Sequence, residues 1–590
     1  MIYSLKYRRM VAGTLVLLAF LWVTVLTVDD YFGRPDQTLL VLLFSVCPLI
    51  VIGLADRKAA LKISTIDILA FAWFSYSILN ALFLSVNHSK DAFIPLTTTF
   101  VLYAILRLVL PQERSLDKIL VAGIVVFGLY ECVVGLLQLY GFERSNHAVF
   151  RITGTFFNPG PYSIYVATML AVCMAYCHKR YRIYSLRNHI GEKCGVRLAG
   201  NMLVLLCAAG CIVGLIALPA TLSRTAFVAL AVVLFVLFVR CNPRILLTVM
   251  ALALVLGAIL YFLKKNSADG RLLMWIVSLK AICGHPVFGS GIGGFHKVFS
   301  DSQKEYFMAN PDSSLASVAG APEYAFNDFL EVGVEQGLVG MLLFSLIIIV
   351  SICKLLRGKN EIGYGLLALS VCAMFSYPFS LLPFKILGCL FVSRAAAWDK
   401  RPLIIIAGWH KAVVSIIFCM ICVSLLIPIN IRIRDKVNAV KDFAIDKILR
   451  IRTVNDLHLE RAKILCDHPK YLFWLGKRLK NAGRYEESLD AFRRGTEVSC
   501  DNMFYVMMGN VYTSLKRFDE AEDHYKVAHY MQPCKLYPLY QLLLLYESEG
   551  RTEDANRLAQ AILDSNPKVR SSATDEMKTY ASEFLRGSVR

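Results

Sequence analysis

Up to about residue 430, long apolar runs alternate with short polar connections along this chain. Each run approaches the roughly 20 residues that an α-helix needs to cross the hydrocarbon core of a bilayer. The runs lie at about 11–28, 38–54, 66–84, 93–110, 119–140, 162–177, 198–218, 225–239, 245–263, 337–353, 363–379, 382–392 and 413–429. The run at 382–392 is short, so the pattern predicts a polytopic membrane protein with twelve or thirteen transmembrane helices.

The longest interruption of this pattern is the polar stretch from Lys264 to Asp328. A connection of about 60 residues is unusual, and long loops often carry binding or catalytic groups on a rigid scaffold. Three parts of it hold residue types that suit such chemistry, namely Arg271-Leu-Leu-Met-Trp275, the glycine-rich stretch Pro286–Phe295, and Glu323-Tyr-Ala-Phe-Asn327-Asp328, which leads to Glu331 and Glu335. We therefore expect the functional site in this loop.

From about Asn430 the chain becomes polar and repetitive. Three tetrapeptides recur at intervals of 33 and 34 residues, namely Gly483-Arg-Tyr-Glu486, Lys516-Arg-Phe-Asp519 and Gly550-Arg-Thr-Glu553. Small residues follow each of their arginines by four positions, at Ser488, Ala521 and Ala555, where they let paired helices cross closely. The period and the pattern resemble tetratricopeptide repeats, which stack into an α-solenoid. Because such solenoids mostly bind peptides or proteins, we expect a protein partner.

Together these patterns predict an all-α protein with a C-terminal α-solenoid. The expected parts are a transmembrane domain at 1–430 with its large loop at 264–328, a linker at 431–453, tetratricopeptide-like repeats at 454–570, and a tail at 571–590. Cys466, Cys500 and Cys534 are 34 residues apart. We interpret them as equivalent packed positions of the repeats rather than as metal ligands.

The distribution of Lys and Arg predicts the orientation. Lys6, Arg8 and Arg9 precede the first run, and no cleavage site follows it, so we interpret this run as a retained span with a cytoplasmic N-terminus rather than a secretory signal. Alternate connections are then rich in Lys and Arg, at 57–62, 107–118, 179–197, 240–244, 354–359 and 400–411. The positive-inside rule makes these connections cytoplasmic. The loop at 264–328 and, with thirteen spans, the repeats are expected outside.

Composition supports the membrane class and excludes others. Hydrophobic residues make up 56% of the chain and charged residues only 18%, below the roughly 25% of an average soluble domain. The net charge of +19 lies largely in the predicted inner connections, so we expect no nucleic-acid partner. The 17 cysteines show no zinc-like spacing, and Cys419 and Cys422, the C-x-x-C pair, lie inside an apolar run, so we expect no metal.

Four motifs fall on the predicted outer side. They are Arg151-Ile-Thr-Gly-Thr-Phe-Phe-Asn158-Pro-Gly160, Leu222-Ser-Arg224-Thr225, and the two ends of the long loop. In this order they resemble the O-antigen ligase superfamily, which also holds O-antigen polymerases and bacterial protein O-oligosaccharyltransferases. The resemblance implies transfer of a glycan from an undecaprenyl-pyrophosphate carrier to an acceptor hydroxyl at the periplasmic face of the bacterial inner membrane, without a cofactor.

Arginine suits this reaction because it binds pyrophosphate oxygens in pairs while it stays charged. Arg224 opens an apolar run, where a cation is costly without a partner, and is the first catalytic candidate; the alternative is an Arg that extends to the membrane interface. Arg271 is the second. Its assignment depends on the spacing to Trp275, which matches the family, because an exposed loop Arg needs no explanation. By the resemblance, Arg151, Asn158 and Trp275 are expected to contact the substrate.

The end of the loop carries the remaining candidates. Asn327, Glu331 and Glu335 are four residues apart, so they share one face of a helix that enters the membrane. Carboxylates there are functional by default, although Glu335 has the alternative of capping backbone groups near Gly337. The catalytic candidates of this segment are Glu323, Asn327 and Asp328, and the substrate-binding candidates are Glu331 and Glu335.

The sequence departs from the family pattern at two positions. Phe326 stands where members commonly carry a His thought to help activate the acceptor, and a Phe can neither accept nor relay a proton. Either Glu323, Tyr324 or Asp328 replaces it, or positioning and leaving-group stabilisation carry the reaction. Gly160 stands where members often have a second Asn, so that contact is not expected. The glycines at 289–294 lack a following Lys and Ser or Thr, and we interpret them as a tight turn.

The predicted function is therefore that of a membrane glycosyltransferase with an exported repeat domain. A repeat domain suits a protein acceptor, which favours an O-oligosaccharyltransferase that acts on a protein hydroxyl. The alternatives are an O-antigen ligase that acts on a lipid or surface acceptor and an O-antigen polymerase. Outside the enzymes, the alternatives are a lipid-linked glycan transporter and a membrane anchor for a repeat scaffold. The polar motifs gather on one face of the membrane, as expected for chemistry at a surface.

Overall fold

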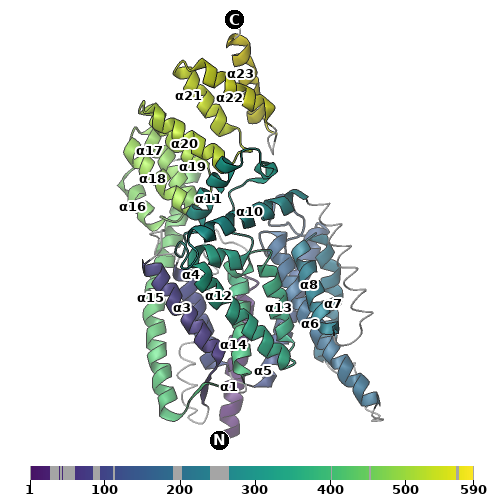
Figure 1. The fold of residues 1–590 in the computed structure, drawn as a ribbon. Helices are drawn as coiled ribbons and strands as arrows, with labels where there is room; N and C mark the ends of the chain where they lie inside the picture. The colour runs from purple at the N-terminus through teal and green to yellow at the C-terminus, as the bar shows by residue number, and fades with distance from the viewer. Residues whose placement is uncertain are drawn as a thin grey trace.

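The computed structural model describes residues 2–26, 39, 43, 60–83, 93–110, 113–189, 202–239, 265–399, 402–450, 453–565 and 570–588. These residues are almost wholly helical (Figure 1). Their one sheet pairs β1 (Leu61–Ile63) antiparallel with β2 (Ile404–Ile406). The all-α class is confirmed. The apolar run at 245–263 and most of the run at 38–54 lie outside the described residues.

The membrane part consists of packed apolar helices. They are α1 (Ile2–Val23), α3 (Thr65–Phe83), α4 (Phe93–Val109), α5 (Arg114–Leu139), α6 (Pro159–His189), α7 (Met202–Ala220), α8 (Arg224–Phe238), α12 (Asp328–Arg357), α13 (Ile362–Ala373), α14 (Leu382–Ala397) and α15 (Gly408–Ile448). Six described helices, α3, α5, α6, α7, α12 and α15, are long and apolar enough to cross a membrane. The chain is thus a multi-pass membrane protein, and the total of twelve or thirteen spans stays a prediction.

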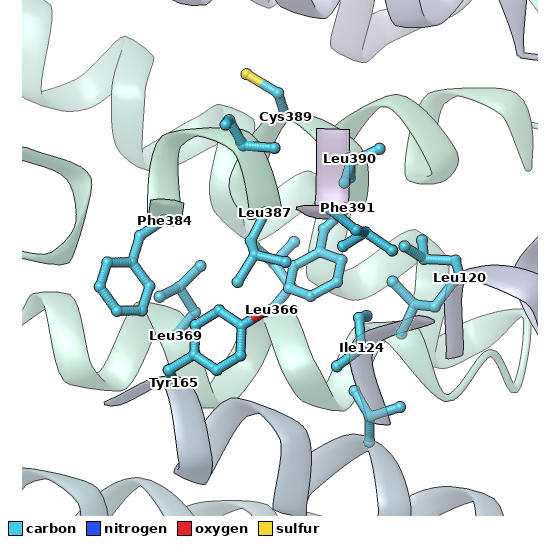
Figure 2. Close-up of a cluster of buried hydrophobic side chains, with 14 of the residues drawn as sticks. Leu120, Ile124, Tyr165, Leu366, Leu369, Phe384, Leu387, Cys389, Leu390 and Phe391 are labelled. Atoms are coloured by element: carbon cyan, nitrogen blue, oxygen red, sulfur yellow. The ribbon is translucent and has the colours of Figure 1, made fainter. Parts of the chain in front are cut away.

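Helix α14, which covers the short apolar run, lies inside the bundle. Its Leu387 and Phe391 point toward Leu120 of α5, Tyr165 of α6 and Leu366 of α13 (Figure 2). Almost all of its residues are buried, as expected for a helix that is apolar on every side. Whether α14 crosses the membrane completely stays a prediction.

The polar loop between α8 and α12 is itself folded. It forms α10 (Lys265–Gly284), α11 (Phe295–Ala309) and the short 3₁₀-helix η4 (Ser314–Val318). Buried side chains of these elements, among them Leu273, Phe299 and Phe307, build a separate hydrophobic core. The loop is therefore a small helical cap on the bundle, which gives its residues fixed positions.

The C-terminal part is a stack of helix pairs. Its helices are α16 (Asp456–Ile464), α17 (Pro469–Asn481), α18 (Tyr485–Val498), α19 (Met503–Ser514), α20 (Phe518–Met531), α21 (Tyr537–Ser548), α22 (Thr552–Asp564) and α23 (Ser572–Ser588). A Cβ atom on Gly476 would lie 2.5 Å from the ring of Phe492, and one on Gly509 would lie 2.5 Å from the ring of Tyr525. The pairs α17–α18 and α19–α20 thus each come close at a glycine, as expected for a solenoid, and the solenoid class is confirmed.

The segment expected to be a linker is mostly helical. Helix α15 continues from the membrane part through residues 431–448, and its Phe443 packs against Tyr471 of α17 at 5.1 Å between ring centroids. The membrane helix and the first repeats therefore share one core, which also includes Leu475 and Leu479. The repeats are joined to the bundle by a packed helix rather than by a loose linker.

The repeats also pack on the cap, because α11 contacts α18 and α20. The Gln303 side chain donates to the backbone oxygen of Met531 at 2.5 Å. The Cys500 thiol donates to the oxygen of His296 at 3.4 Å, and the Cys534 thiol donates to that of Ala319 at 3.3 Å. Two of the three repeated cysteines thus contact the cap, and the equivalence of their positions in the repeats stays an interpretation. The cap and the repeats therefore lie at the same end of the bundle.

Those basic connections that the structure describes gather at the other end, where the N-terminus lies (Figure 1). Segments 61–63 and 404–406 pair there as β1 and β2, directly before α15 starts its course toward the repeats. Arg107 pairs with Asp67 at 2.7 Å, and Lys179 pairs with Glu361 at 2.8 Å. The contacts between these connections agree with the alternation that the Lys and Arg distribution predicts.

Candidate functional site

The two candidate arginines lie close together, although they are 47 residues apart in sequence. Arg224 is the first residue of α8, and its guanidinium donates to the Ser267 hydroxyl of α10 at 3.2 Å. Arg271 of α10 donates in return to the Thr225 hydroxyl of α8 at 3.2 Å. The two helices thus hold the guanidinium groups beside each other where α8 leaves the bundle.

The electrostatics of this pair favour an anion. Burial and the neighbouring charge of Arg224 lower the pKa of Arg271 to about 10, so it is still charged at neutral pH. Two like charges this close repel each other, and an anion that binds both removes the repulsion. A phosphate or pyrophosphate can accept paired hydrogen bonds from each guanidinium. We call Arg224 and Arg271 the arginine pair.

A line of aromatic rings leads away from the arginine pair. The guanidinium carbon of Arg271 lies 5.7 Å from the ring centroid of Phe326, and Phe326 lies 4.9 Å from Tyr377, edge to face. Tyr377 stacks on Tyr324 at 4.3 Å. The sequence provided no sign of Tyr377, which is buried within the predicted apolar run at 363–379.

Phe326 adopts an uncommon backbone conformation. Its φ of +52° lies in the left-handed region, which aromatic residues rarely enter and which costs on the order of 1–3 kcal/mol. The surroundings fix this conformation, because the next residue, Asn327, caps α12. The Asn327 side chain accepts hydrogen bonds from the backbone nitrogens of Phe329 at 3.0 Å and Leu330 at 3.2 Å. Asn327 thus positions Phe326 over Arg271, which gives this residue a clear structural role.

Asp328 and Glu331 also bind backbone groups. Asp328 is buried and accepts from the backbone nitrogen of Phe379 at 2.9 Å, close to Tyr377. Glu331 accepts from the backbone nitrogen of Ala325 at 3.0 Å, and the Ser380 hydroxyl donates to it at 3.4 Å. Both carboxylates therefore hold the segments that carry the aromatic line.

Glu335 holds the glycine turn. Its carboxylate accepts from the backbone nitrogen of Gly293 at 2.9 Å, and its backbone oxygen accepts from Gly291 at 2.8 Å. The turn enters a break in α12 at Gly337, where φ is +64°. A Cβ atom on Gly289 would lie 2.5 Å from the backbone of Glu335. These glycines thus form a tight turn, as predicted, and Glu335 caps backbone groups of that turn.

Trp275 and Glu323 of the long loop have polar side-chain atoms that a ligand could contact. Trp275 lies one turn after Arg271 on α10, and its buried indole nitrogen has no hydrogen-bond partner among the described residues. Buried donors without partners are uncommon in native structures, and a ligand is one explanation. Glu323 is exposed, and its charge acts on the hydroxyl of Tyr377.

The motif before α6 is clamped by polar residues of α5. Gln138 accepts from the backbone nitrogen of Gly154 at 2.8 Å, and Glu131 accepts from the Thr155 hydroxyl at 2.6 Å. The oxygen of the Asn158 side chain accepts from the nitrogen of Gly160 at 3.0 Å at the start of α6. Glu131 was not among the sequence candidates, although a single carboxylate in the apolar run at 119–140 was its signal.

The rest of this motif lies at the same end of the bundle. The Ser163 hydroxyl donates to the Ser223 hydroxyl at 2.7 Å, which links α6 to the residue before Arg224. Arg151 is exposed and forms no hydrogen bond or ion pair with another described residue. The structure therefore places Asn158 and Arg151 near the mouth of the bundle without joining them to the arginine pair.

Two cavities border the site. One, of about 410 Å³, lies between α3, α4, α12 and α14, where Asp328, Glu331, Glu335 and Lys385 meet aromatic and aliphatic side chains. The other, of about 1380 Å³, lies between the repeats and the cap and is lined by Glu323 and Tyr324. We call the second cavity the repeat groove. Tyr324 joins it to the aromatic line, and through that line to the arginine pair.

The fold defines a multi-pass membrane protein with two neighbouring arginines beneath a helical cap. Residues 209–345 match the family model described as O-Antigen ligase, and residues 504–533 match the one described as Tetratricopeptide repeat. The two matches confirm the predicted resemblance to the O-antigen ligase superfamily with C-terminal tetratricopeptide repeats. The first match includes the arginine pair, Trp275 and the candidates at 323–335. A search of curated proteins found no match.

Proposed function

We propose that this protein transfers a glycan from an undecaprenyl-pyrophosphate carrier to a hydroxyl group of an acceptor protein. In this proposal the site faces the periplasm from the bacterial inner membrane. The matched family supports glycan transfer in general. The donor, the acceptor and the orientation are the specific parts of the proposal.

One observation carries the choice of a protein acceptor. A continuous series of ring contacts runs from Arg271 through Phe326 and Tyr377 to Tyr324, which lines the repeat groove. The repeat groove is therefore connected to the arginine pair by one series of contacting side chains, which supports an acceptor held by the repeats. A ligase or a polymerase has no need of this arrangement.

In the proposed reaction, the arginine pair binds the pyrophosphate of the donor. The acceptor hydroxyl oxygen attacks the first sugar carbon, the bond from this carbon to the pyrophosphate oxygen breaks, and undecaprenyl pyrophosphate leaves. The guanidinium groups stabilise the charge that develops on the leaving oxygen. Trp275 lies one helical turn away, and its indole nitrogen, which has no partner among the described residues, can donate to an oxygen of the glycan donor.

The acceptor proton needs a separate destination because Phe326 cannot take it. Glu323 is an exposed carboxylate that acts on the Tyr377 hydroxyl and lies where the repeat groove meets the aromatic line. We assign it as the group that accepts this proton. Asn327, Asp328 and Glu331 hold the segments around it through backbone hydrogen bonds, so we assign them as positioning residues.

The periplasmic orientation is supported by charge. The basic connections contact one another at the end of the bundle opposite the cap, and the positive-inside rule keeps such connections in the cytoplasm. The cap, the arginine pair and the repeats are then exported together.

Glycan profiling of a deletion strain tests the proposal. The expected result is loss of protein-bound glycan, which a plasmid with the wild-type chain restores, while lipid-bound glycan keeps its amount and length. Loss of lipid-bound glycan with intact glycoproteins would indicate ligation instead. A change in chain length alone would indicate polymerisation.

A further inference from the structure

The repeat groove has an unusual charge for a surface so close to an anion site. Its walls come from α15 and α17, from the ends of α18 and α20, from the first turns of α19, α21 and α23, and from His296 and residues 319–324 of the cap. The cations that line it are Lys447, Lys470, Lys477, Arg478 and Lys535, and its carboxylates are Glu323 and Asp501. Asp501 is already 3.6 Å from Lys535. The groove is therefore strongly positive.

Three of these cations lie over aromatic rings. Lys447 is 5.6 Å from the ring centroid of Phe443, Lys477 is 5.8 Å from that of Phe473, and Arg478 is 5.8 Å from that of Trp474. Lys447 and Lys477 are exposed. A ring holds the position of a cation without neutralising it, so these charges stay available to an anionic ligand.

The same rings give the groove an apolar floor. Phe473 and Trp474 are partly buried and line the cavity, together with Tyr537. Asn481 adds an exposed side-chain amide, which can donate to and accept from a peptide backbone. Cations, apolar rings and an amide together suit an extended polypeptide with acidic and apolar side chains better than they suit a neutral or basic one.

We propose that the repeat groove binds an extended acidic segment of the acceptor protein and directs a nearby hydroxyl past Tyr324 to the arginine pair. This inference rests on the proposed function, because it specifies the acceptor. Charge complementarity selects the partner, and opposite charges on partner surfaces raise both the association rate and the specificity. Glu323, at the inner end of the groove, repels acidic residues, so the modified hydroxyl lies beyond the acidic segment.

The test uses the full-length enzyme in detergent without any donor. Three fluorescein-labelled peptides of equal length, one rich in Glu and Leu, one rich in Lys and Leu and one rich in Ser and Leu, are compared by fluorescence anisotropy. We expect binding of the acidic peptide alone and a loss of affinity as salt rises, since salt screens exposed charges. The variant Lys447→Glu/Lys477→Glu should weaken this binding by about tenfold or more.

A matched variant controls for net charge. Lys463→Glu/Arg586→Glu makes the same change of charge at exposed positions outside the groove and should bind like the wild type. Lys447→Met/Lys477→Met keeps the side-chain length without the charge, and it should also weaken binding. Melting temperatures of all variants identify any that do not fold, in which case the Met variant replaces the Glu variant.

Several outcomes would overturn the inference. They are equal binding of the three peptides, an unchanged affinity in both groove variants, and preference for a phosphorylated oligosaccharide probe over the acidic peptide. Because no glycan is transferred in this assay, its failure leaves the glycan profiles of the deletion strain unaffected. A failure of the profiles, in turn, does not alter peptide binding, so the two proposals fail separately.

Discussion

At the scale of single residues, the site divides into groups that hold the backbone and groups that remain for a ligand. Asn327, Asp328 and Glu335 accept hydrogen bonds from backbone nitrogens, and each fixes one segment of the site. Arg224 and Arg271 instead donate to the hydroxyl groups of Ser267 and Thr225 at 3.2 Å, and together they hold two positive charges close to each other. We therefore propose that the arginines carry the chemistry and that the polar residues in the first turns of α12 hold the backbone of the site in place.

Replacement of Arg224 by Lys should remove most of the activity although the charge is kept. An ammonium group lacks the planar fork that holds two phosphate oxygens, so the loss should be at least about tenfold. The matched control is Arg557→Lys, at an exposed position on α22 of the repeats, outside the proposed site. Transfer rates of purified variants at equal protein levels measure the effect. Near-normal transfer by Arg224→Lys would make this residue an anchor at the membrane interface.

Acidification should loosen the contact between cap and repeats through His296. Burial lowers the pKa of His296 to about 4, against 6.5 in the unfolded chain. Between these pH values the unfolded chain therefore binds more protons than the folded protein. Its contribution is complete above about pH 6.5 and is lost as the pH falls toward about 4. Protease protection of α11 across this range measures the loss. His296→Gln should flatten the pH dependence, and an unchanged dependence would remove His296 from this role.

At the scale of elements, the glycine turn fixes the break in α12 near Gly337. The turn at 286–294 places its backbone in the helix break, and Leu338 donates to the oxygen of Pro286 at 2.8 Å. From α3, Tyr76 donates to the oxygen of Gln336 at 2.6 Å, and Asn80 donates to that of Phe288 at 2.7 Å. The cap is thus tied to the bundle by backbone hydrogen bonds at the point where α12 bends.

Gly337→Ala should destabilise the protein. Gly337 has φ +64° and ψ −168°, a conformation that only glycine adopts easily, and an added Cβ would lie 2.3 Å from the oxygen of Val287. We expect a cost of about 1–3 kcal/mol or more. A lower melting temperature in detergent would report it. The control Gly284→Ala meets no atom within 4 Å, so equal melting temperatures of the two variants would contradict this description.

The sequence predicted those elements whose signal is local. Apolar runs predict membrane helices, and the period of 33 to 34 residues predicts the solenoid, because each signal repeats within one segment. The helices α10 and α11 were missed, since the loop alternates few apolar residues with many polar ones and its core forms only against α12 and the repeats. The formation of α10 and α11 depends on tertiary contacts, which the sequence pattern does not reveal.

The sequence indicates which residues are candidates for the site, but it does not indicate which partners each of them contacts. The structure brings Arg224, Arg271 and the segment 323–335 close together, and their function stays a prediction. Their roles depend on partners far away in the sequence, such as Thr225 for Arg271 and Phe379 for Asp328. Tyr377 and Glu131 could not be assigned either, because a tyrosine or a single Glu in an apolar run does not reveal what it contacts.

At the scale of the whole molecule, the two ends of the helical bundle carry different groups of residues. One end gathers the basic connections and the N-terminus, and the other gathers the cap, the arginine pair and the repeats (Figure 1). Helix α15 joins these ends, since it starts beside β2 and its last turns pack within the repeats. The repeat groove therefore has a fixed position above the site.

This arrangement predicts the orientation of both parts. A reporter that works only in the periplasm should be active when it is fused after Ser565. A reporter that works only in the cytoplasm should be active when it is fused after His189. The expectation depends on an odd number of spans, for which Leu382–Val392 is the decisive segment. A cytoplasmic reporter signal after Ser565 would place the repeats inside and contradict the capture of exported acceptors.

The central claim is that the arginine pair and the repeat groove act together to place a glycan on a protein. The most direct measurement is mass spectrometry of an acceptor protein after incubation with purified enzyme and an undecaprenyl-pyrophosphate-linked glycan. We predict a mass increase of one glycan with the wild type, its loss with Arg224→Lys, and its reduction with Lys447→Glu/Lys477→Glu. An acceptor that stays unmodified while the enzyme transfers the same glycan to a lipid acceptor would contradict the claim.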